Sequence, residues 1–520
     1  MNGDISRITF NPLKHFTSVL LQQGRVQIDA DWNEQSSILL HYLRALGADL
    51  IGQHGGPDDL FNNQAARTGM LARNCGFGIV AAKKTGNTIN FFPSGEILQS
   101  EKDTLNTMPN TQVPLMITVG HYYVDGLLCE NENFSRYSQQ PYRDQANDDE
   151  LRDLTGVFLL YLDVWERLIT SLEDSTIREV ALGGADTAAR TKLTWQVKVW
   201  PRDIPLPPPV NCNDFNKAWS QQILHDLKPE NRGRLIAKAK ESGPGAEANP
   251  CITSPEARYR GMENQLYRVE VHQGGPALNN TSTNQDEAAT FKWSRDNSTV
   301  VASLKRKEGD RLIVSGLRDF SRWFAVGNWV EITHDALELN GLPGTLVRLA
   351  RVEGESLTID PFTTSGTIYE PNSKFQGLPL SNLKVRRWDQ KQPEDGLLKE
   401  GALMIEENKW SELEDGVEIK FEPGGSLTTQ YRTGDYWLIP ARVSTGNVEW
   451  PQTAVPDPNV PGQFLPDPDD PTKFLMGPKP LPPHGVVHHY APLAMVTFDN
   501  GQPGGIVDLR HKFPPLGVCS

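Results

Sequence analysis

The sequence predicts a mainly β, multidomain protein built from short-stranded sandwich or barrel units, with an N-terminal helix and a helical insertion. Three observations predict this fold class. At 520 residues, the chain is too long for a single core. Its 44 glycines and 38 prolines favour many turns over long helices. From residue 111 onward, short runs rich in Val, Ile, Leu and aromatic residues are bounded by Gly, Asn or Pro, as strands are.

Residues 1–110 are expected to form a docking region in which a short strand leads into a helix. Apolar and polar residues alternate over residues 24–32, which is typical of a strand. Asp31 followed three residues later by Glu34 fits a capping pattern, so we expect the helix to begin at Asp31. The helix carries an apolar stripe made of Leu39, Leu43, Leu46 and Leu50, with Ile38 and Tyr42 beside it.

Residues 111–305 are expected to form one β domain with a helical insertion at residues 203–253. Two of its predicted strands alternate clearly. One points Leu193, Trp195, Val197 and Val199 to a single face, and the other does the same with Tyr267, Val269 and Val271. In the insertion, a four-residue spacing predicts a helix, and a second helix is expected near residues 234–240. The spaced residues are Phe215, Trp219, Ile223 and Leu227.

Two further units are expected. Residues 306–390 contain short strands at close, even spacing, the pattern of a small barrel or sandwich. Residues 391–520 are expected to form a C-terminal β unit, interrupted by a proline-rich arm at residues 451–483. The arm has too little apolar content to build a core, so we expect an extended, polyproline-like surface wrap. No internal repeat of fixed period is expected anywhere in the chain.

Composition excludes several classes of function. The formal charge of −14 argues against nucleic acid as a partner, because phosphate binding needs clustered Lys and Arg. The opening residues have no apolar core of the kind that an export signal needs, and no apolar run is long enough to cross a bilayer. The cysteines are odd in number, far apart and without a C-x-x-C pair, which indicates a reducing cytoplasm and neither a zinc site nor a disulfide framework. They are Cys75, Cys129, Cys212, Cys251 and Cys519.

An acidic cluster near the N-terminus is the first candidate for chemistry. Asp29, Asp31 and Glu34 surround Trp32, and carboxylates grouped beside an aromatic residue are typical of a glycoside-cleaving site. The same residues also fit an ordinary helix start, in which a cap stabilises by about 1 kcal/mol. The helix start is favoured, because caps are much commoner than catalytic pairs.

Three other candidates are weaker. His484, His488 and His489 lie close enough in sequence to hold a metal, but neighbouring prolines argue against the helix that would bring them together, so a turn with hydrogen-bonded histidines is favoured. Ser294, flanked by charged residues, has no histidine nearby and fits a strand that runs into a turn. The charged neighbours are Lys292, Arg295 and Asp296. The Gly-Gly loop at residues 181–191 lacks a phosphate-binding pattern. We therefore expect no catalytic, cofactor-binding or metal site, and no cofactor.

Long stretches of the chain resemble a family of uncharacterised proteins from bacterial phage-tail-like gene clusters. The matching stretches, in order, are "GDISRITFNPLKHFTSVLLQQGRVQIDADWNEQ", "YLDVWERLITSLEDSTIREVALGGADTAARTKLTWQVKV", "PEARYRGMENQLYRVEVHQGG", "ATFKWSRDNSTVV", "RTGDYWLIPAR", "PPHGVVHHYAPLA" and "IVDLRHKFPPL". The resemblance implies an accessory component of a contractile injection system, encoded beside sheath, tube and baseplate proteins. It implies no catalytic residues.

The leading hypothesis is therefore a non-enzymatic structural protein at the baseplate of a contractile injection particle or at its peripheral extension. Its expected partners are baseplate, sheath or spike subunits and further copies of itself in a symmetric assembly. We expect assembly in the cytoplasm and membrane contact only through the particle, whether that is released or membrane-anchored. Trp388, Trp437 and Trp450 are either interface anchors or core residues. The alternatives are a tip or fibre-like protein that binds a receptor or glycan through tryptophans and, third, a glycan or cell-wall hydrolase.

Overall fold

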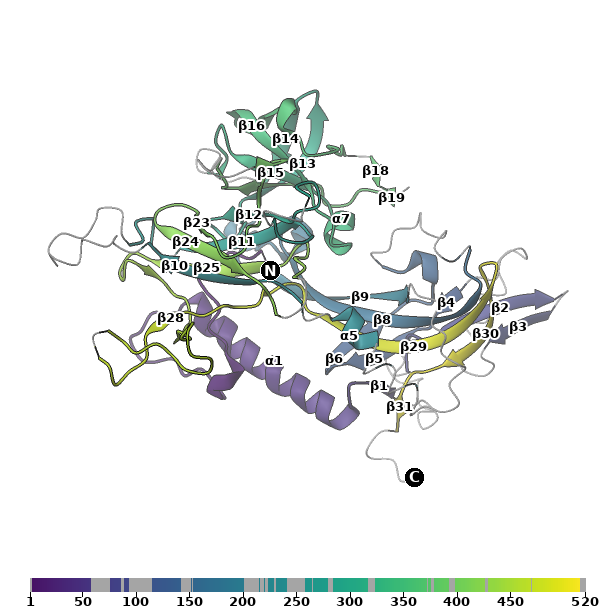
Figure 1. The fold of residues 1–520 in the computed structure, drawn as a ribbon. Helices are drawn as coiled ribbons and strands as arrows, with labels where there is room; N and C mark the ends of the chain where they lie inside the picture. The colour runs from purple at the N-terminus through teal and green to yellow at the C-terminus, as the bar shows by residue number, and fades with distance from the viewer. Residues whose placement is uncertain are drawn as a thin grey trace.

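The computed structural model confirms a mainly β protein with one long helix near its N-terminus (Figure 1). The long helix, α1, spans Asp29–Ile51. The structure describes residues 2–57, 75–85, 88–92, 115–141, 151, 153–200, 215, 219, 223–228, 231–240, 258–263, 265–278, 284–316, 323–371, 373–375, 378–391, 398–425, 429–468 and 470–514. Most of the insertion expected at residues 203–253 lies outside these ranges.

The first lobe contains a sheet in which strands from both ends of the chain lie side by side. The order is β30-β29-β8-β9, formed by Gln502–Asp508, His488–Asp499, Gly156–Ile169 and Arg190–Val199. Strands β8 and β29 pair antiparallel, from Gly156 opposite Phe498 to Trp165 opposite His488. The C-terminal strands thus complete a sheet that begins more than 300 residues earlier.

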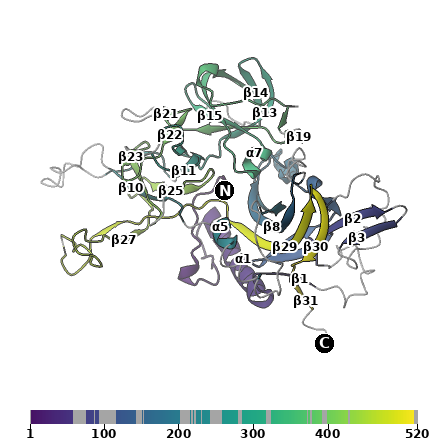
Figure 2. The ribbon, with the colours of Figure 1, turned by 45° about the vertical axis from the view of Figure 1, so that its right-hand side comes forward.

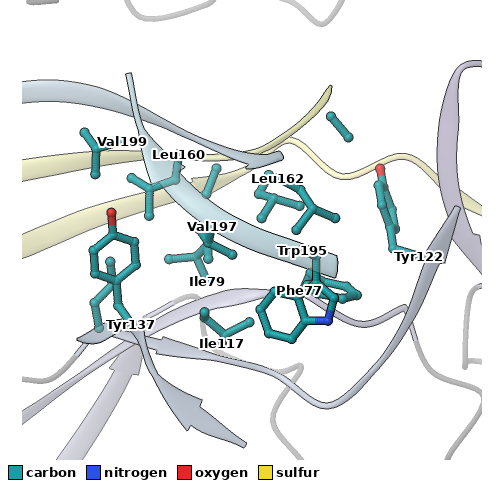
Figure 3. Close-up of a cluster of buried hydrophobic side chains, with 14 of the residues drawn as sticks. Phe77, Ile79, Ile117, Tyr122, Tyr137, Leu160, Leu162, Trp195, Val197 and Val199 are labelled. Carbon is teal, nitrogen blue, oxygen red and sulfur yellow. The ribbon is translucent and has the colours of Figure 1, made fainter. Parts of the chain in front are cut away.

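Two smaller sheets accompany this one in the same lobe. One has the order β3-β2-β4-β7, formed by Thr88–Phe92, Ile79–Thr85, Leu115–Ile117 and Ser135–Arg136. The other has the order β31-β1-β5-β6, formed by Lys512–Phe513, His54–Pro57, Gly120–Val124 and Leu127–Asn131. Side chains from all three sheets share a core, in which Phe77 packs edge-on against Trp195 with ring centroids 4.9 Å apart (Figure 3). Trp195, Val197 and Val199 lie in this core, as their alternation in β9 predicts, with Leu193 half-buried against it.

The second lobe pairs a six-stranded sheet with a three-stranded one. The first has the order β21-β22-β12-β11-β25-β26, formed by Leu398–Lys399, Ala402–Met404, Thr290–Ser294, Gln265–Gln273, Tyr436–Arg442 and Asn447–Val448. The second has the order β10-β24-β23, formed by Arg234–Ala239, Val417–Glu422 and Trp410–Glu412. Tyr267, Val269 and Val271 lie in the core of this lobe, as predicted from their alternation.

The helix expected near residues 234–240 is wrong, because this segment forms strand β10. Strand β10 pairs antiparallel with β24 from Arg234 to Ala239. Leu235, Ile236 and Ala237 are all buried, because both faces of the strand are covered over this stretch. Of the predicted first helix, the structure describes α5, Leu224–Leu227, and the buried residues Phe215, Trp219 and Ile223, which pack on the first lobe.

The third lobe is a closed barrel, drawn at the top of Figure 1. Its strands follow the order β13-β14-β17-β16-β15-β20, formed by Val301–Glu308, Arg311–Ser315, Ser356–Asp360, Thr345–Glu353, Trp329–Thr333 and Lys384–Trp388. These strands cover the range over which the sequence predicts a small barrel or sandwich. The hairpin β18 and β19, Lys374–Phe375 and Leu378–Pro379, and the short helix α7, Asp335–Leu339, lie in the connections.

The sequence predicts a separate C-terminal unit over residues 391–520, and this prediction is wrong. Strand β25 pairs with β11, β24 with β10, and β29 with β8. Each of these late strands therefore fills a place in a sheet begun by the earlier part of the chain. Short hydrophobic segments of this kind carry no local signal for their distant partners.

The proline-rich arm contains a ten-residue repeat, so the expectations of no repeat and of a purely extended arm are both wrong. Residues 455–464 and 465–474 share the pattern of an aliphatic residue, Pro-Asp-Pro, a further Pro at position seven and Phe at position ten. Their hairpins carry the bridges Pro456–Phe464 and Pro466–Phe474. A third pair, β27 with β28, closes the arm. These two strands are Gln452–Ala454 and Met476–Pro478.

The two repeat hairpins and the β27–β28 pair meet at three residues that are spaced ten apart. The backbone N–H of Val455 donates to the carbonyl of Leu475, that of Leu475 to Leu465, and that of Leu465 to Val455. This ring of hydrogen bonds satisfies the backbone without a large core, since none of the described residues from 451 to 489 is buried. Figure 2 shows the arm, next to the label β27, projecting away from the lobes.

Candidate interaction surface

The N-terminal segment folds back along α1 and holds its first half. The backbone N–H of Ser6 donates to the Asp29 carboxylate at 2.8 Å, and the Thr9 hydroxyl donates to Glu34 at 2.7 Å. The ring of Phe10 lies 5.7 Å from that of His41 between centroids. These contacts tie residues 6–10 to the first, second and fourth turns of the helix.

The expected strand before the helix and the expected cap at Asp31 are both wrong. Residues 25–28 form no strand, and α1 begins at Asp29 without a side-chain cap. The two acids of the expected capping pair lie inside the helix, where Glu34 accepts from Thr9. The preceding segment therefore donates hydrogen bonds to acidic side chains of the first two turns of the helix.

The second half of α1 docks against the turn between β5 and β6. Gly126 in this turn has φ +74°, and a Cβ there would overlap the carbonyl oxygen of Arg44. Gly47 also makes a close approach, since a Cβ on it would lie 3.2 Å from the Cα of Gly126. The Arg44 guanidinium pairs with Glu166 of β8 at 2.7 Å. Glycine at position 126 therefore lets the helix backbone lie directly on the turn.

The opposite face of α1 carries an apolar stripe that is open to solvent. The predicted stripe residues Leu39, Leu43, Leu46 and Leu50 are 54–65% exposed. Trp32, 66% exposed, extends the stripe toward the start of the helix. On a wheel of 3.6 residues per turn, these residues lie opposite the buried Ala30 and away from the docked backbone of Arg44. The stripe that the sequence assigns to a core is thus uncovered in this chain.

The exposed apolar residues of the molecule concentrate at this end. Of 30 large hydrophobic side chains that are exposed among the described residues, 14 lie between residues 8 and 50. We call these 14 side chains the N-terminal apolar surface. They are Ile8, Leu13, Phe16, Leu20, Leu21, Val26, Ile28, Trp32, Leu39, Leu40, Tyr42, Leu43, Leu46 and Leu50. Large contiguous apolar surfaces on a folded protein mark sites of protein or membrane contact.

Two acids of the N-terminal cluster, Asp29 and Glu34, accept hydrogen bonds from the N-terminal segment. Burial favours the neutral form of Asp29, but hydrogen bonds from Ser6 outweigh this effect and lower the pKa of its carboxyl group. Glu34 receives the Thr9 hydroxyl. Both carboxylates are therefore occupied by the segment that packs on the helix, and the indole of Trp32 is exposed on the far face.

The three histidines of the proline-flanked segment do not converge. His488 begins strand β29, and its Nδ1 lies 2.6 Å from Asp163. Nδ1 of the adjacent His489 lies 2.7 Å from Asp125. Successive residues of a strand point to opposite faces, so the two imidazoles diverge, and they lie in a strand rather than in the expected turn. The ring of His484 packs beside Tyr436, with centroids 5.5 Å apart. Within the described ranges, no group of three metal-ligating side chains is found.

The charged residues around Ser294 form structural ion pairs. The Lys292 ammonium lies 2.6 Å from Glu331 and 3.3 Å from Glu270, between the six-stranded sheet and the barrel. Arg295 pairs with Glu414 at 2.7 Å. The Ser294 hydroxyl accepts from the backbone of the following turn, as the strand-to-turn interpretation predicts. These contacts join the second lobe to the barrel.

Burial and neighbouring charges shift the pKa values of the titratable side chains at this junction. Desolvation alone would raise the pKa of Glu331, but the ammonium of Lys292 lowers it to about 2. Desolvation and the nearby Lys292 lower the pKa of His272 to about 4. Asp296, in contrast, has a raised pKa because burial outweighs its pairing with Arg387. Glu331 is therefore ionised and pairs with the Lys292 ammonium across the junction, while the neighbouring His272 is neutral.

Trp388, Trp437 and Trp450, predicted to be either interface anchors or core residues, are core residues. Trp388 and Trp437 are at most 1% exposed, and Trp450 is 7% exposed. The indole N–H of Trp388 donates to Glu331 at 2.9 Å. The Gly-Gly loop forms a turn in which Gly183 and Gly184 both have positive φ, as the sequence predicts.

Comparison with known proteins identifies the family of the chain. The model of a family of unknown function, DUF6519, matches residues 1–67, 90–203 and 233–462, so the chain belongs to this family. No curated protein and no solved structure matches the chain. None of the helices in the described part of the chain has the length and apolar character to span a membrane.

The sequence did not predict that the α1 stripe is uncovered. Helical spacing shows which side chains share a face, but a core-facing stripe and a partner-facing stripe have the same spacing. With Trp32 included, the exposed residues of the stripe recur every seven positions, a spacing that a coiled-coil seam also has.

Proposed function

We propose that this chain is a non-enzymatic structural subunit of a phage-tail-like contractile injection particle, located at the baseplate or its peripheral extension. One observation carries the proposal: α1, which supplies half of the N-terminal apolar surface, is docked on one side and carries an uncovered apolar stripe. Such a surface is stabilised when another protein covers it. The resemblance of the sequence to proteins of phage-tail-like clusters supports the class of assembly.

The proline-rich arm supports the same proposal as a second contact element. It projects from the lobes (Figure 2) and exposes the side chains of Phe464 and Phe474, whose ring centroids lie 5.4 Å apart. Met476 on the adjoining strand is 55% exposed. Because its backbone is already fixed by hairpin hydrogen bonds, the arm loses little conformational freedom when it docks on a neighbour.

The alternatives receive less support from the geometry. A glycan-binding tip protein needs exposed tryptophans on its β domains, but Trp388, Trp437 and Trp450 are buried. Trp410 is 37% exposed, but the ammonium groups of Lys238 and Lys420 lie over its ring. The acids proposed for glycan hydrolysis bind the N-terminal segment instead.

The test is incorporation into particles in the producing cell. Sheath-containing particles are purified and probed for the tagged chain, for Leu43→Glu combined with Leu46→Glu, and for the control Phe362→Glu on the barrel. Phe362 is 97% exposed, so the control places a glutamate at an exposed apolar position elsewhere. We expect the unmodified chain and the control in the particles and the double variant to be lost from them. Particles that contain sheath and tube but never this chain would overturn the proposal.

A further inference from the structure

The solvent-exposed stripe of α1 has the spacing of a coiled-coil seam. Trp32, Leu39 and Leu46 are seven residues apart, and so are Ser36, Leu43 and Leu50, with the second set offset by four. These are the d and a positions of a heptad. Over residues 32–50 the seam is about 27 Å long at ~1.5 Å per residue. A stripe this narrow and regular fits another helix better than a flat surface.

The geometry of α1 points to an antiparallel pair with α1 of a second copy of this chain. In an antiparallel pair, a positions pack against d positions of the partner helix. With a two-fold axis at the level of His41, Ser36 lies opposite Leu46, Leu39 opposite Leu43, and Trp32 opposite Leu50. Every seam residue then has a seam residue as its neighbour, and the small Ser36 meets a large side chain. The inference rests on the proposed function, because it names the partner of the same surface.

Charge favours a second copy on this face. The chain carries a formal charge of −14, so two copies repel one another over most orientations. Beside the seam, however, the flanking positions of residues 32–50 contain one charged residue, Asp49. In the antiparallel register Asp49 lies near the uncharged Gln35 of the other copy. The seam is therefore a neutral face on an acidic protein.

Charge also favours the antiparallel direction over the parallel one. The first turns of α1 carry Asp29, Asp31 and Glu34. A parallel pair would place these acids beside their own copies, where like charges repel. It would also place Trp32 against Trp32 and leave Ser36 against Ser36. The antiparallel pair separates the acidic ends by about the length of the seam and aligns the helix dipoles favourably.

Two measurements on the purified full-length chain test the inference. Sedimentation equilibrium is expected to show a dimer that Leu43→Glu weakens at least about 100-fold, because both copies lose an apolar contact. Phe362→Glu is expected to leave the dimer unchanged. Thermal unfolding is expected to show that both variants remain folded. A chain that stays monomeric at its highest soluble concentration would overturn the inference.

Disulfide trapping tests the direction. Trp32→Cys and Leu50→Cys are oxidised separately and as an equimolar mixture, with the unmodified chain and its native cysteines as baseline. The antiparallel pair predicts a cross-linked dimer above baseline in the mixture alone. Cross-linking of each variant with itself and not with the other would show a parallel pair and overturn the assignment.

The outcomes separate this inference from the proposed function. A monomeric chain whose seam variants are still lost from particles would show that a helix of another subunit occupies the seam, so the function would stand and the second copy would fall. If the chain forms a dimer that depends on the seam but is absent from particles, the second copy would stand and the proposed function would fall.

Discussion

The barrel and α1 use similar apolar side chains with opposite results. In the barrel, alternate residues of six strands point inward, and Leu312, Val314 and Leu357 are fully buried because the sheet closes on itself. In α1, an equally regular stripe faces solvent, with Leu43 63% exposed. The comparison teaches that periodicity identifies side chains that share a face, whereas only the arrangement of distant segments decides whether that face is covered.

The largest expected effect is at the ion cluster against the barrel wall. Glu331→Gln removes the carboxylate that Lys292 approaches at 2.6 Å, leaving Glu270 at 3.3 Å as its acidic partner. Because this ammonium is 3% exposed, we expect a loss of about 3–5 kcal/mol in the free energy of unfolding, measured by denaturant titration.

The matched control for this prediction is an exposed pair on the same barrel. Glu308→Gln breaks the pairing with Arg306, whose side chain is 66% exposed. We expect a change within about 0.5 kcal/mol. Equal effects of the two substitutions would contradict a sealed junction.

A truncation in each region tests the comparison directly. Leu357→Ala in the barrel is expected to cost about 2–5 kcal/mol, because it leaves a cavity in a closed core. Leu43→Ala on α1 is expected to change the stability of the monomer by no more than about 0.5 kcal/mol. Both are measured by denaturant titration under dilute conditions that keep the chain monomeric. A large loss for Leu43→Ala there would show that the chain itself covers the stripe.

The docking of α1 is tested by a glycine substitution. Gly126→Ala is expected to cost about 1–3 kcal/mol and to speed hydrogen exchange in α1, because the added methyl group displaces the helix from the turn. Gly309→Ala is the control, since Gly309 has φ +60° with open space around it. The control carries only the backbone strain, about 1 kcal/mol. Unchanged exchange in α1 for Gly126→Ala would contradict the docking contact.

Lowering the pH is expected to lower the free energy of unfolding gradually. Burial lowers the pKa of His54 and His272 to about 4, so between pH 6.5 and 4 the unfolded chain binds protons that the folded chain excludes. Stability therefore falls as pH falls through this window, by up to about 1.4 kcal/mol per pH unit for each histidine. Asp435 opposes this, because burial raises its pKa to about 6.

The substitution His272→Asn is expected to flatten the pH dependence of the unfolding free energy between pH 6.5 and 4. Asp435→Asn is expected to steepen it, because the opposing group is gone. The measurement is denaturant titration at a series of pH values. A pH profile that His272→Asn leaves unaltered would show that this histidine is not kept neutral by the fold.

Much of the local structure could be predicted from sequence, and the pairing of distant segments could not. The alternation in β9 and β11 identified their buried faces correctly. Strand β10 was mistaken for a helix because its six residues contain good helix formers, and its true partner, β24, lies about 180 residues away.

The candidate site shows the same division. The α1 stripe was predicted residue by residue, but not its exposure, which depends on the turn at Gly126 docking on the opposite face. The proline spacing of the arm contains a ten-residue repeat that helix and strand periods do not reveal. The structure shows the role of this repeat, because it places Val455, Leu465 and Leu475 in one ring of backbone hydrogen bonds.

The most direct test is an electron-microscopy map of the intact particle in which this chain is located. We predict density for the chain at the baseplate or its extension, with the seam of α1 covered by a helix of another subunit. A particle in which the seam lies bare in solvent while the chain is held by other surfaces would contradict the account.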